Sequence, residues 1–391
     1  MTRITPDSTR SAGFSVPAPP PTVVIAPDAF KGTATAQQAA QWLGDGVRSV
    51  IRDARVIAVP MADGGEGTSS LFEGQRITLP TTDAVGRLTE ATYTFDAATQ
   101  TAYIDVAAAT GLPAVADSPA PMTGDTYGTG VLVADAETRG ARRVVLGLGG
   151  SATVDGGTGI LVALGINPLN QQGYTLTPGG GALGDLADFD TAKMNIPAAS
   201  MEWILLADAL VPATGERGAA RVFGPQKGAS EAEVEALDRA LAKLCEVTGV
   251  DGTTPGYGAA GGIAIGVSWV STLLHGTGDH VRVLPGAKVV AEANDLAEKV
   301  ADASLVITGE GRFDSQTAEG KVVSTVLDIA AGTDAAVAVV AGSFEAKVES
   351  RNPLITVALE GLSGEGDVQE QLTRAGAAVA TDYLRISTTQ G

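Results

Sequence analysis

Glycine-rich loops that carry acidic residues follow several short β-branched runs of this chain. These runs lie at residues 22–26, 55–59, 143–147, 304–308 and 335–341, and helical patterns separate them. Strands that alternate with helices are typical of an α/β protein with a parallel sheet. Such sheets bind ligands at the carboxyl ends of their strands. The pattern therefore predicts an α/β fold with a doubly wound, mainly parallel sheet and a ligand site beside its loops.

Chain length and strand spacing predict two domains. The chain has 391 residues, against about 100–200 for an average domain. Closely spaced strands at 76–79, 92–95 and 101–106 predict hairpins or a mixed sheet in the middle. We therefore expect three parts, namely a flexible tail at 1–21, a doubly wound α/β domain from 22–80 plus 285–385, and an inserted α/β domain at 81–284.

Two further segments have clear local signals. A helix is predicted from Ser230 to Val247, because Ser230 and Glu233 form a capping box ahead of an apolar stripe. Residues 170–184 are rich in glycine and proline and predict a long loop.

The charge balance excludes several kinds of partner. The formal net charge is −19, which disfavours nucleic acid and anionic membrane surfaces.

The start of the chain lacks the apolar core of a signal peptide, and residues 252–278 are too rich in glycine, serine and threonine to span a membrane. A single cysteine fits a reducing compartment, so we expect a cytoplasmic protein. With only two histidines, most zinc chemistry is also excluded.

The first two loops combine acids with glycines. Asp28 and Lys31 lie on a tight turn after the first strand, where a local ion pair explains them as well as a ligand does. After the second strand, Asp63 and Glu66 lie within Met61-Ala-Asp-Gly-Gly-Glu-Gly-Thr68. These carboxylates suit either Mg²⁺ or a proton from a substrate hydroxyl, and the glycine amides suit an anion.

Two later loops complete the pattern. The segment 147–157 satisfies G-x-G-x-x-A, but it has no acid about 20 residues further on to hold a ribose. Its Ser151 and Thr153 suit phosphate and carboxylate equally. Residues 308–315 bring Glu310, Arg312 and Asp314 to the end of a strand. Such a mixture of cations, carboxylates and amides is what phosphoryl transfer needs, whereas a surface cluster of salt bridges is the alternative.

These motifs, in this order, resemble the type I glycerate kinase family. The matching stretches are IAPDAFKG from Ile25, PMADGGEGT from Pro60, YGTG from Tyr127, GGSATVDGG from Gly149, FGPQKGA from Phe223 and TGEGRFDSQTAEGK from Thr308. On the residues alone, Lys227 in the fifth stretch could be only the lead-in to a helix. The sequence departs from the family at 208–215, at Val154 and at Asp105.

The resemblance implies a kinase that uses ATP and Mg²⁺ to phosphorylate D-glycerate at its 2-hydroxyl, in a cleft between two domains. The expected catalytic residues are Asp63, with Asp28 and Asp314 as competitors for the role of base, and Lys31. The expected metal ligands are Glu66 and Glu310. The residues expected to bind substrate or phosphate are Arg312, Lys321, Gly64, Gly65, Gly149, Gly150, Ser151 and Thr153.

Three other functions stay open at this point. One is a non-catalytic anion-binding protein of the same fold, in which the departures around Asp208 and at Val154 have ended turnover. An NAD-linked hydroxy-acid oxidoreductase would use the loop at 147–157, although the missing ribose acid and the scarcity of histidine disfavour it. A kinase of another small hydroxy acid would use the same residues as the glycerate enzyme. The sequence does not predict an oligomeric state.

Overall fold

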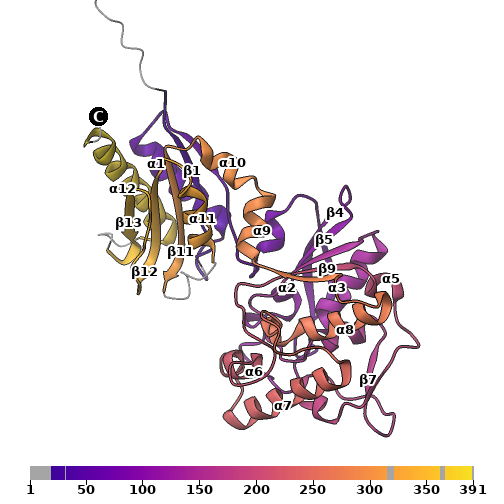
Figure 1. Cartoon of the computed structure of the whole chain (residues 1–391). Helices are drawn as coiled ribbons and strands as arrows, with labels where there is room; N and C mark the ends of the chain where they lie inside the picture. Colours follow the sequence, from indigo (N-terminus) through magenta and orange to yellow (C-terminus); the bar gives the residue numbers. More distant parts are fainter. Residues whose placement is uncertain (1–18, 31, 315–320, 362–365, 390–391) are drawn as a thin grey trace, which may run out of the picture.

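A computed structural model describes residues 19–30, 32–314, 321–361 and 366–389, and its first sheet joins the two ends of the chain (Figure 1). The flexible tail predicted at 1–21 therefore lies almost wholly outside the described residues. The sheet has five parallel strands in the order β13-β12-β11-β1-β2. The strands are β1 (Thr22–Ile25), β2 (Arg55–Ala58), β11 (Leu305–Phe313), β12 (Ala336–Phe344) and β13 (Leu354–Ala358).

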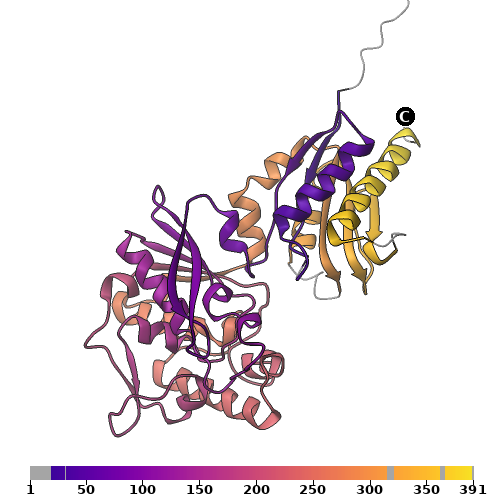
Figure 2. The same cartoon turned by 180° about the vertical axis from the view of Figure 1, so that it is seen from behind.

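Helices cover both faces of this sheet, which is the doubly wound arrangement that the sequence predicts. Val23 and Ile25 face the helices α1 (Ala36–Val50) and α12 (Val368–Thr389). The alternate side chain, Val24, faces the opposite layer. That layer contains α9 (Gly286–Ala293), α10 (Leu296–Ala301) and α11 (Val322–Ala330). Figure 2 shows the pair α1 and α12 side by side on one face of the sheet.

The second sheet is mixed, as the strand spacing predicts. It has six strands in the order β10-β9-β6-β5-β4-β3, and the pairs β3–β4 and β4–β5 are antiparallel while the others are parallel. Their bounds are β3 (Gln75–Thr82), β4 (Leu88–Asp96), β5 (Thr101–Asp105), β6 (Arg143–Gly147), β9 (Glu202–Leu206) and β10 (Val281–Leu284). A separate hairpin joins β7 (Asn167–Leu169) to β8 (Asp188–Asp190).

One large hydrophobic core lies around the second sheet. Trp203 and Tyr93, both fully buried, are among its largest side chains. The helices of this part are α2 (Val106–Thr110), α3 (Tyr127–Thr138), α4 (Thr158–Ala163), α5 (Ile196–Ala199), α6 (Ala219–Phe223), α7 (Glu231–Thr248) and α8 (Ile263–His275). The capping box of α7 is present as predicted, because Ser230 Oγ accepts from the Glu233 amide while the Glu233 side chain accepts from the Ser230 amide.

Short 3₁₀ turns complete the described structure. They are η1 (Thr68–Leu71), η2 (Pro113–Val115), η3 (Gly180–Asp185), η4 (Pro225–Lys227), η5 (Ala259–Gly261) and η6 (Leu359–Gly361). The predicted loop at 170–184 thus ends within η3.

The chain passes between the two sheets twice, once between β2 and β3 and once between β10 and α9 (Figure 1). The boundary expected near residue 80 falls inside β3, whereas the one near 285 falls directly after β10. Among the described residues, no helix is both long enough and apolar enough to cross a membrane.

Candidate functional site

Three acidic segments lie side by side at the carboxyl edge of the first sheet. Strand β1, which lies between β11 and β2, leads to Asp28, whose amide donates to the Gly309 carbonyl of β11 at 2.9 Å. On the other side, the Met61 amide donates to the Pro27 carbonyl at 2.9 Å. The strand order β11-β1-β2 therefore gathers the end of β11, which carries Glu310, and the loops that carry Asp28 and Asp63. Asp28 and Asp63 are buried, with 9% and 8% of their surfaces exposed.

The loop expected after residue 308 is instead a continuation of strand β11. Pairing with β12 continues to Phe313, because the glycines at this point let the two backbones approach closely. A Cβ on Gly309 would lie 2.1 Å from the Val340 carbonyl oxygen. Glu310 and Arg312 consequently project from the same face of a β ribbon.

Arg312 already has an acidic partner in this structure. Its guanidinium forms an ion pair with Glu345, and 63% of the Arg312 side chain is exposed. This hydrogen bond raises the pKa of Arg312 above its ordinary value. An anionic ligand at this position would have to compete with Glu345.

The loop after β2 reaches the carboxyl edge of the second sheet. The Gly149 amide donates to the Gly64 carbonyl at 2.9 Å. Gly64 has a φ of +101°, and a Cβ there would lie 2.8 Å from the Leu206 carbonyl oxygen at the end of β9. A Cβ on Gly149 would lie 2.6 Å from the Cα of Gly65. Glycine is thus required on both sides of this contact, which brings the predicted positions Gly64, Gly65 and Gly149 together.

Asp105 fastens the same loop to the end of β5. Its carboxylate accepts hydrogen bonds from the Gly67 amide at 3.0 Å, the Ser69 amide at 2.9 Å and the Ser69 hydroxyl at 2.9 Å. Burial raises the pKa of Asp105 to about 6, although these three donors oppose the shift. The sequence identifies this residue only as a departure from the family and does not predict its structural role.

The segment Gly149–Thr153 forms a pinned turn beside that contact. The Leu112 amide donates to the Gly150 carbonyl at 2.8 Å, and the Ala152 amide donates to the Thr110 carbonyl at 2.9 Å. Gly150 is exposed and has a φ of +76°. Ser151 and Thr153 are buried, and their hydroxyl oxygens are 3.2 Å apart. The predicted positions 149–153 therefore form one fixed loop.

Lys227 is not among the predicted site residues, yet its side chain hydrogen-bonds to this turn. It ends η4 and is only 3% exposed. Its ammonium donates to the Thr153 carbonyl at 2.6 Å and to Ser151 Oγ at 3.4 Å. Burial lowers the pKa of Lys227 to about 7, and the charge of Asp155 opposes that shift. The only sequence signal for this position is its place in the FGPQKGA stretch.

Three of the remaining predicted positions lie outside the described structure or at its edges, and the fourth, Glu66, lies within it. Lys31 lies outside the described residues, as does the segment 315–320. Lys321 precedes α11, and its carbonyl accepts from the Thr325 amide at 3.0 Å. Asp314 directly follows β11. Glu66 is exposed on the loop after β2.

Two of the predicted acidic positions, Glu310 and Glu66, have the hard oxygen donors that Mg²⁺ prefers. In the described part of the chain, no three carboxylate, histidine or cysteine side chains form a complete metal site. Mg²⁺ commonly uses only one or two protein carboxylates together with water and phosphate oxygens. Glu310, on the ribbon beside Asp28, and Glu66 offer hard oxygen donors of this kind.

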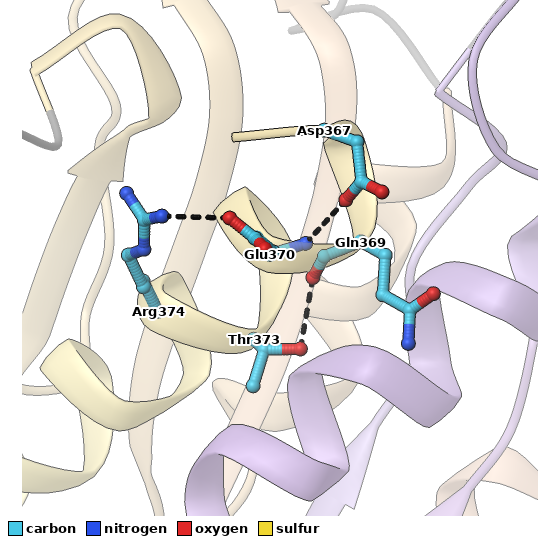
Figure 3. Close-up of a pocket in the computed structure, with 5 residues that line it drawn as sticks. All are labelled: Asp367, Gln369, Glu370, Thr373 and Arg374. Carbon is cyan, nitrogen blue, oxygen red and sulfur yellow. Dashed lines mark hydrogen bonds and ion pairs between the residues drawn. The ribbon is translucent and has the colours of Figure 1, made fainter. Parts of the chain in front are cut away.

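A hollow of about 440 Å³ lies elsewhere, over the first turns of α12 (Figure 3). Figure 3 shows its side chains hydrogen-bonded within their own helix, with Arg374 on Glu370 at 2.9 Å and the Glu370 amide on Asp367 at 3.0 Å. These contacts account for the polar groups as helix capping and an i, i+4 pair. The hollow contains none of the predicted site residues.

Comparisons with known proteins agree with the motifs. A family model described as the glycerate kinase family matches residues 23–389. The chain is 38% identical to a glycerate kinase of Halalkalibacterium halodurans, over 83% of this chain and 86% of that protein. It is 37% identical to the glycerate 2-kinase of Escherichia coli K12, over 82% of this chain and 85% of that protein.

The fold has a solved relative as well. A crystal structure of a proposed glycerate kinase 2 from Salmonella typhimurium LT2 superposes with a TM-score of 0.77 at 31% identity. The match covers 95% of this chain and all of that one.

Proposed function

The chain belongs to the glycerate kinase family and is a phosphotransferase, and from this premise we propose that it transfers the γ-phosphoryl group of ATP to the 2-hydroxyl of D-glycerate. The observation that carries the proposal is the contact between the Gly64–Gly65 loop and the turn at Gly149. It joins the acidic carboxyl edge of one sheet to the amide-rich carboxyl edge of the other. A phosphoryl acceptor and its donor need such opposite chemistries close together.

Asp63 is the proposed general base. It is buried, its Oδ1 accepts from the Gly65 amide at 3.1 Å, and it lies on the loop that contacts both sheets. In the proposed reaction, Asp63 takes the proton of the 2-hydroxyl as that oxygen bonds to the γ-phosphorus. The bond between this phosphorus and the β–γ bridging oxygen breaks, and ADP leaves with that oxygen. Asp28 and Asp314 are the alternatives for the base.

Cations and amides are proposed to hold the charged ends of the substrates. The glycerate carboxylate would bind at the turn Gly149–Thr153, with help from Lys31 and from Arg312 once it leaves Glu345. Lys321, at the start of α11, would steady the transferred group. The amides at Gly64 and Gly65 would fix the geometry.

Glu66 and Glu310 are the proposed ligands of Mg²⁺. When bound, the ion would neutralise charge on the phosphate oxygens of ATP. Glu310 lies on the ribbon next to the Asp28 loop, so it can contribute an oxygen close to Asp28, one of the alternatives for the base. The reaction would occur in the cytoplasm, where ATP is available.

We also propose that the two sheets belong to two domains that close over the substrates. Closure would exclude water, which otherwise competes with glycerate as the phosphoryl acceptor. The two crossing segments, before β3 and after β10, would be the hinges. Small-angle scattering with glycerate and a non-hydrolysable nucleotide should show a smaller radius of gyration, and an unchanged profile contradicts closure.

The direct test is an ADP-release assay with Mg-ATP and D-glycerate, followed by phosphorus NMR of the product. We expect turnover and a 2-phosphoglycerate signal. A 3-phosphoglycerate signal would keep the kinase but contradict the choice of hydroxyl. If ADP is released only with another hydroxy acid, that acid and not D-glycerate is the substrate. A change in nicotinamide absorbance without ADP release would support the oxidoreductase instead.

A further inference from the structure

A buried lysine supports the turn that we assign to the substrate carboxylate, although it is not part of the proposed catalytic set. Lys227 comes from the segment between α6 and α7, far along the chain from the turn after β6. Its side chain is 3% exposed, so it does not act as a surface cation. A buried ammonium costs free energy unless it is paired and hydrogen-bonded, so its position requires an explanation.

The partners of Lys227 are the backbone and a hydroxyl of the turn. Its Nζ donates to the Thr153 carbonyl at 2.6 Å and to Ser151 Oγ at 3.4 Å. Ser151 Oγ also accepts from the Thr153 amide at 3.2 Å. A hydroxyl has two acceptor positions and one hydrogen. Since both acceptor positions are occupied, Ser151 can only donate its hydrogen, either to Thr153 Oγ1 or to a ligand.

The charge of Asp155, which acts on Lys227, is already stabilised by several hydrogen bonds of the protein. Asp155 accepts from Thr126 through both its amide at 2.9 Å and its hydroxyl at 2.8 Å, and from the Gly157 and Gly159 amides at 3.3 and 2.9 Å. The charge of Asp155 also acts on Asp125, whose pKa is raised to about 6 by burial and by that charge. These donors spread the charge of Asp155, so Lys227 can still stabilise an anion above the turn.

We propose that Lys227 is a positioning residue for the carboxylate of the acceptor substrate. From beneath the turn it fixes the Thr153 carbonyl, makes the Ser151 hydroxyl a donor toward the anion and supplies a positive charge. The inference rests on the proposed function, because it takes the turn Gly149–Thr153 to be the glycerate subsite. Since burial brings the pKa of Lys227 near neutrality, an arriving carboxylate would favour its protonated form.

The test compares Lys227→Met with Lys243→Met, a lysine on α7 that pairs with Glu246 at the surface. For Lys227→Met we expect the KM for D-glycerate to rise at least about tenfold, the KM for ATP to stay within about twofold, and Lys243→Met to match the wild type. A glycerate KM that stays within about twofold, or an equal rise in both KM values, overturns the inference.

A double-mutant cycle with Ser151→Ala tests whether Lys227 acts through that hydroxyl. We expect the two losses in glycerate affinity to be non-additive, because both variants remove the same oriented donor. Additive losses contradict the inference. The wild-type affinity should also fall as the pH rises above 7, whereas that of Lys227→Met should stay flat. If Lys227→Met fails to fold, Ser151→Ala and the wild-type pH profile decide between these outcomes.

Calorimetry of D-glycerate binding without ATP separates this inference from the proposed function. A wild type that binds glycerate but releases no ADP contradicts the proposed kinase reaction, while the ratio of affinities between variant and wild type still tests Lys227. A wild type that binds no glycerate at millimolar concentration overturns both.

Discussion

Asp105 and Ser69 are joined by two hydrogen bonds, so that the end of β5 holds the loop that follows β2. The Ser69 amide donates to Oδ1 and its hydroxyl donates to Oδ2, each at 2.9 Å. The Gly67 amide adds a third donor at 3.0 Å. This loop carries Asp63 and the glycines that contact the second sheet. Asp105 therefore acts on the candidate site from outside it.

Asp105→Asn should destabilise the protein and lower kcat. Asparagine has an NH₂ group in place of one carboxylate oxygen, and this group cannot accept a hydrogen bond. At least one of the groups that now donate to Asp105 would therefore lose its acceptor, and a buried unsatisfied donor costs about 1–3 kcal/mol. We expect a loss of that size in urea unfolding at pH 7. The matched control is Asp117→Asn, which removes an exposed partner of Arg87 and should change stability by less than about 1 kcal/mol. Equal stability of the two variants would show that the hydrogen bonds to Asp105 contribute little to the free energy of unfolding.

Gly64→Ala should be far more damaging than Gly67→Ala. Both residues have positive φ values, +101° and +90°, so each substitution carries a backbone cost of about 1–2 kcal/mol. Only at Gly64 would the new Cβ also lie 2.8 Å from the Leu206 carbonyl oxygen, whereas nothing lies within 4 Å at Gly67. Thermal melts should rank the variants in this order, and activity should follow. A Gly67→Ala protein as impaired as Gly64→Ala contradicts the close contact between the two edges.

Lys227 should make the stability of the wild type depend on pH. Its pKa is lowered from 10.5 to about 7 in the folded protein, so between these values the unfolded chain binds more protons than the folded one. Stability must then rise with pH across this window, by up to about 1.4 kcal/mol per pH unit from this group. Urea unfolding at pH 7 and pH 9 should show the wild type gaining stability relative to Lys227→Met. If the free energy of unfolding changes equally in both proteins between pH 7 and pH 9, the pKa of Lys227 is not lowered by folding.

The proposed base can be tested among its competitors. Asp63→Asn should lower kcat by about 10²–10⁴-fold, as expected when a general base is lost, with little change in either KM. Asp28→Asn and Asp314→Asn should have smaller effects on kcat if they do not take the proton. Circular dichroism should confirm that each variant is folded. Near-normal turnover in both Asp63→Asn and Asp314→Asn rejects the present assignment.

Local signals in the sequence predict the helices and strands that have a clear periodicity. The elements that are not predicted are those whose stability depends on pairing with distant parts of the chain. The capping box at Ser230 and the hairpins of the mixed sheet are confirmed. Strand β9 is not among the predicted strands, although four of its five residues are apolar. In the structure the carboxylate of its Glu202 forms ion pairs with Arg143 and Arg282 on the two neighbouring strands. Such compensation depends on strand order, which single-sequence patterns do not contain.

The same limit applies to the candidate site. The glycines near Glu310 indicate a loop, yet they belong to strand β11. Glycine is needed there because β12 lies too close for a side chain. The acids and glycines of the site are visible as motifs since each motif is contiguous. Lys227 acts on residues more than 70 positions away, as the separations of its two hydrogen bonds show. Its role is therefore evident only from the structure, which brings Lys227 into contact with the turn at Ser151.

Removal of Mg²⁺ should stop the reaction and can distinguish the two proposed ligands. With EDTA in excess we expect no ADP release, and added Mg²⁺ should restore it. Glu310→Gln should raise the half-saturating Mg²⁺ concentration by about tenfold, because a carboxylate binds this hard cation better than an amide does. Glu66 is exposed, so Glu66→Gln should have a smaller effect, and Glu73→Gln, also exposed but on the far side of η1 next to β3, should have none. If only Glu66→Gln shifts the Mg²⁺ requirement, the metal binds on the loop after β2 and not on the β11 ribbon.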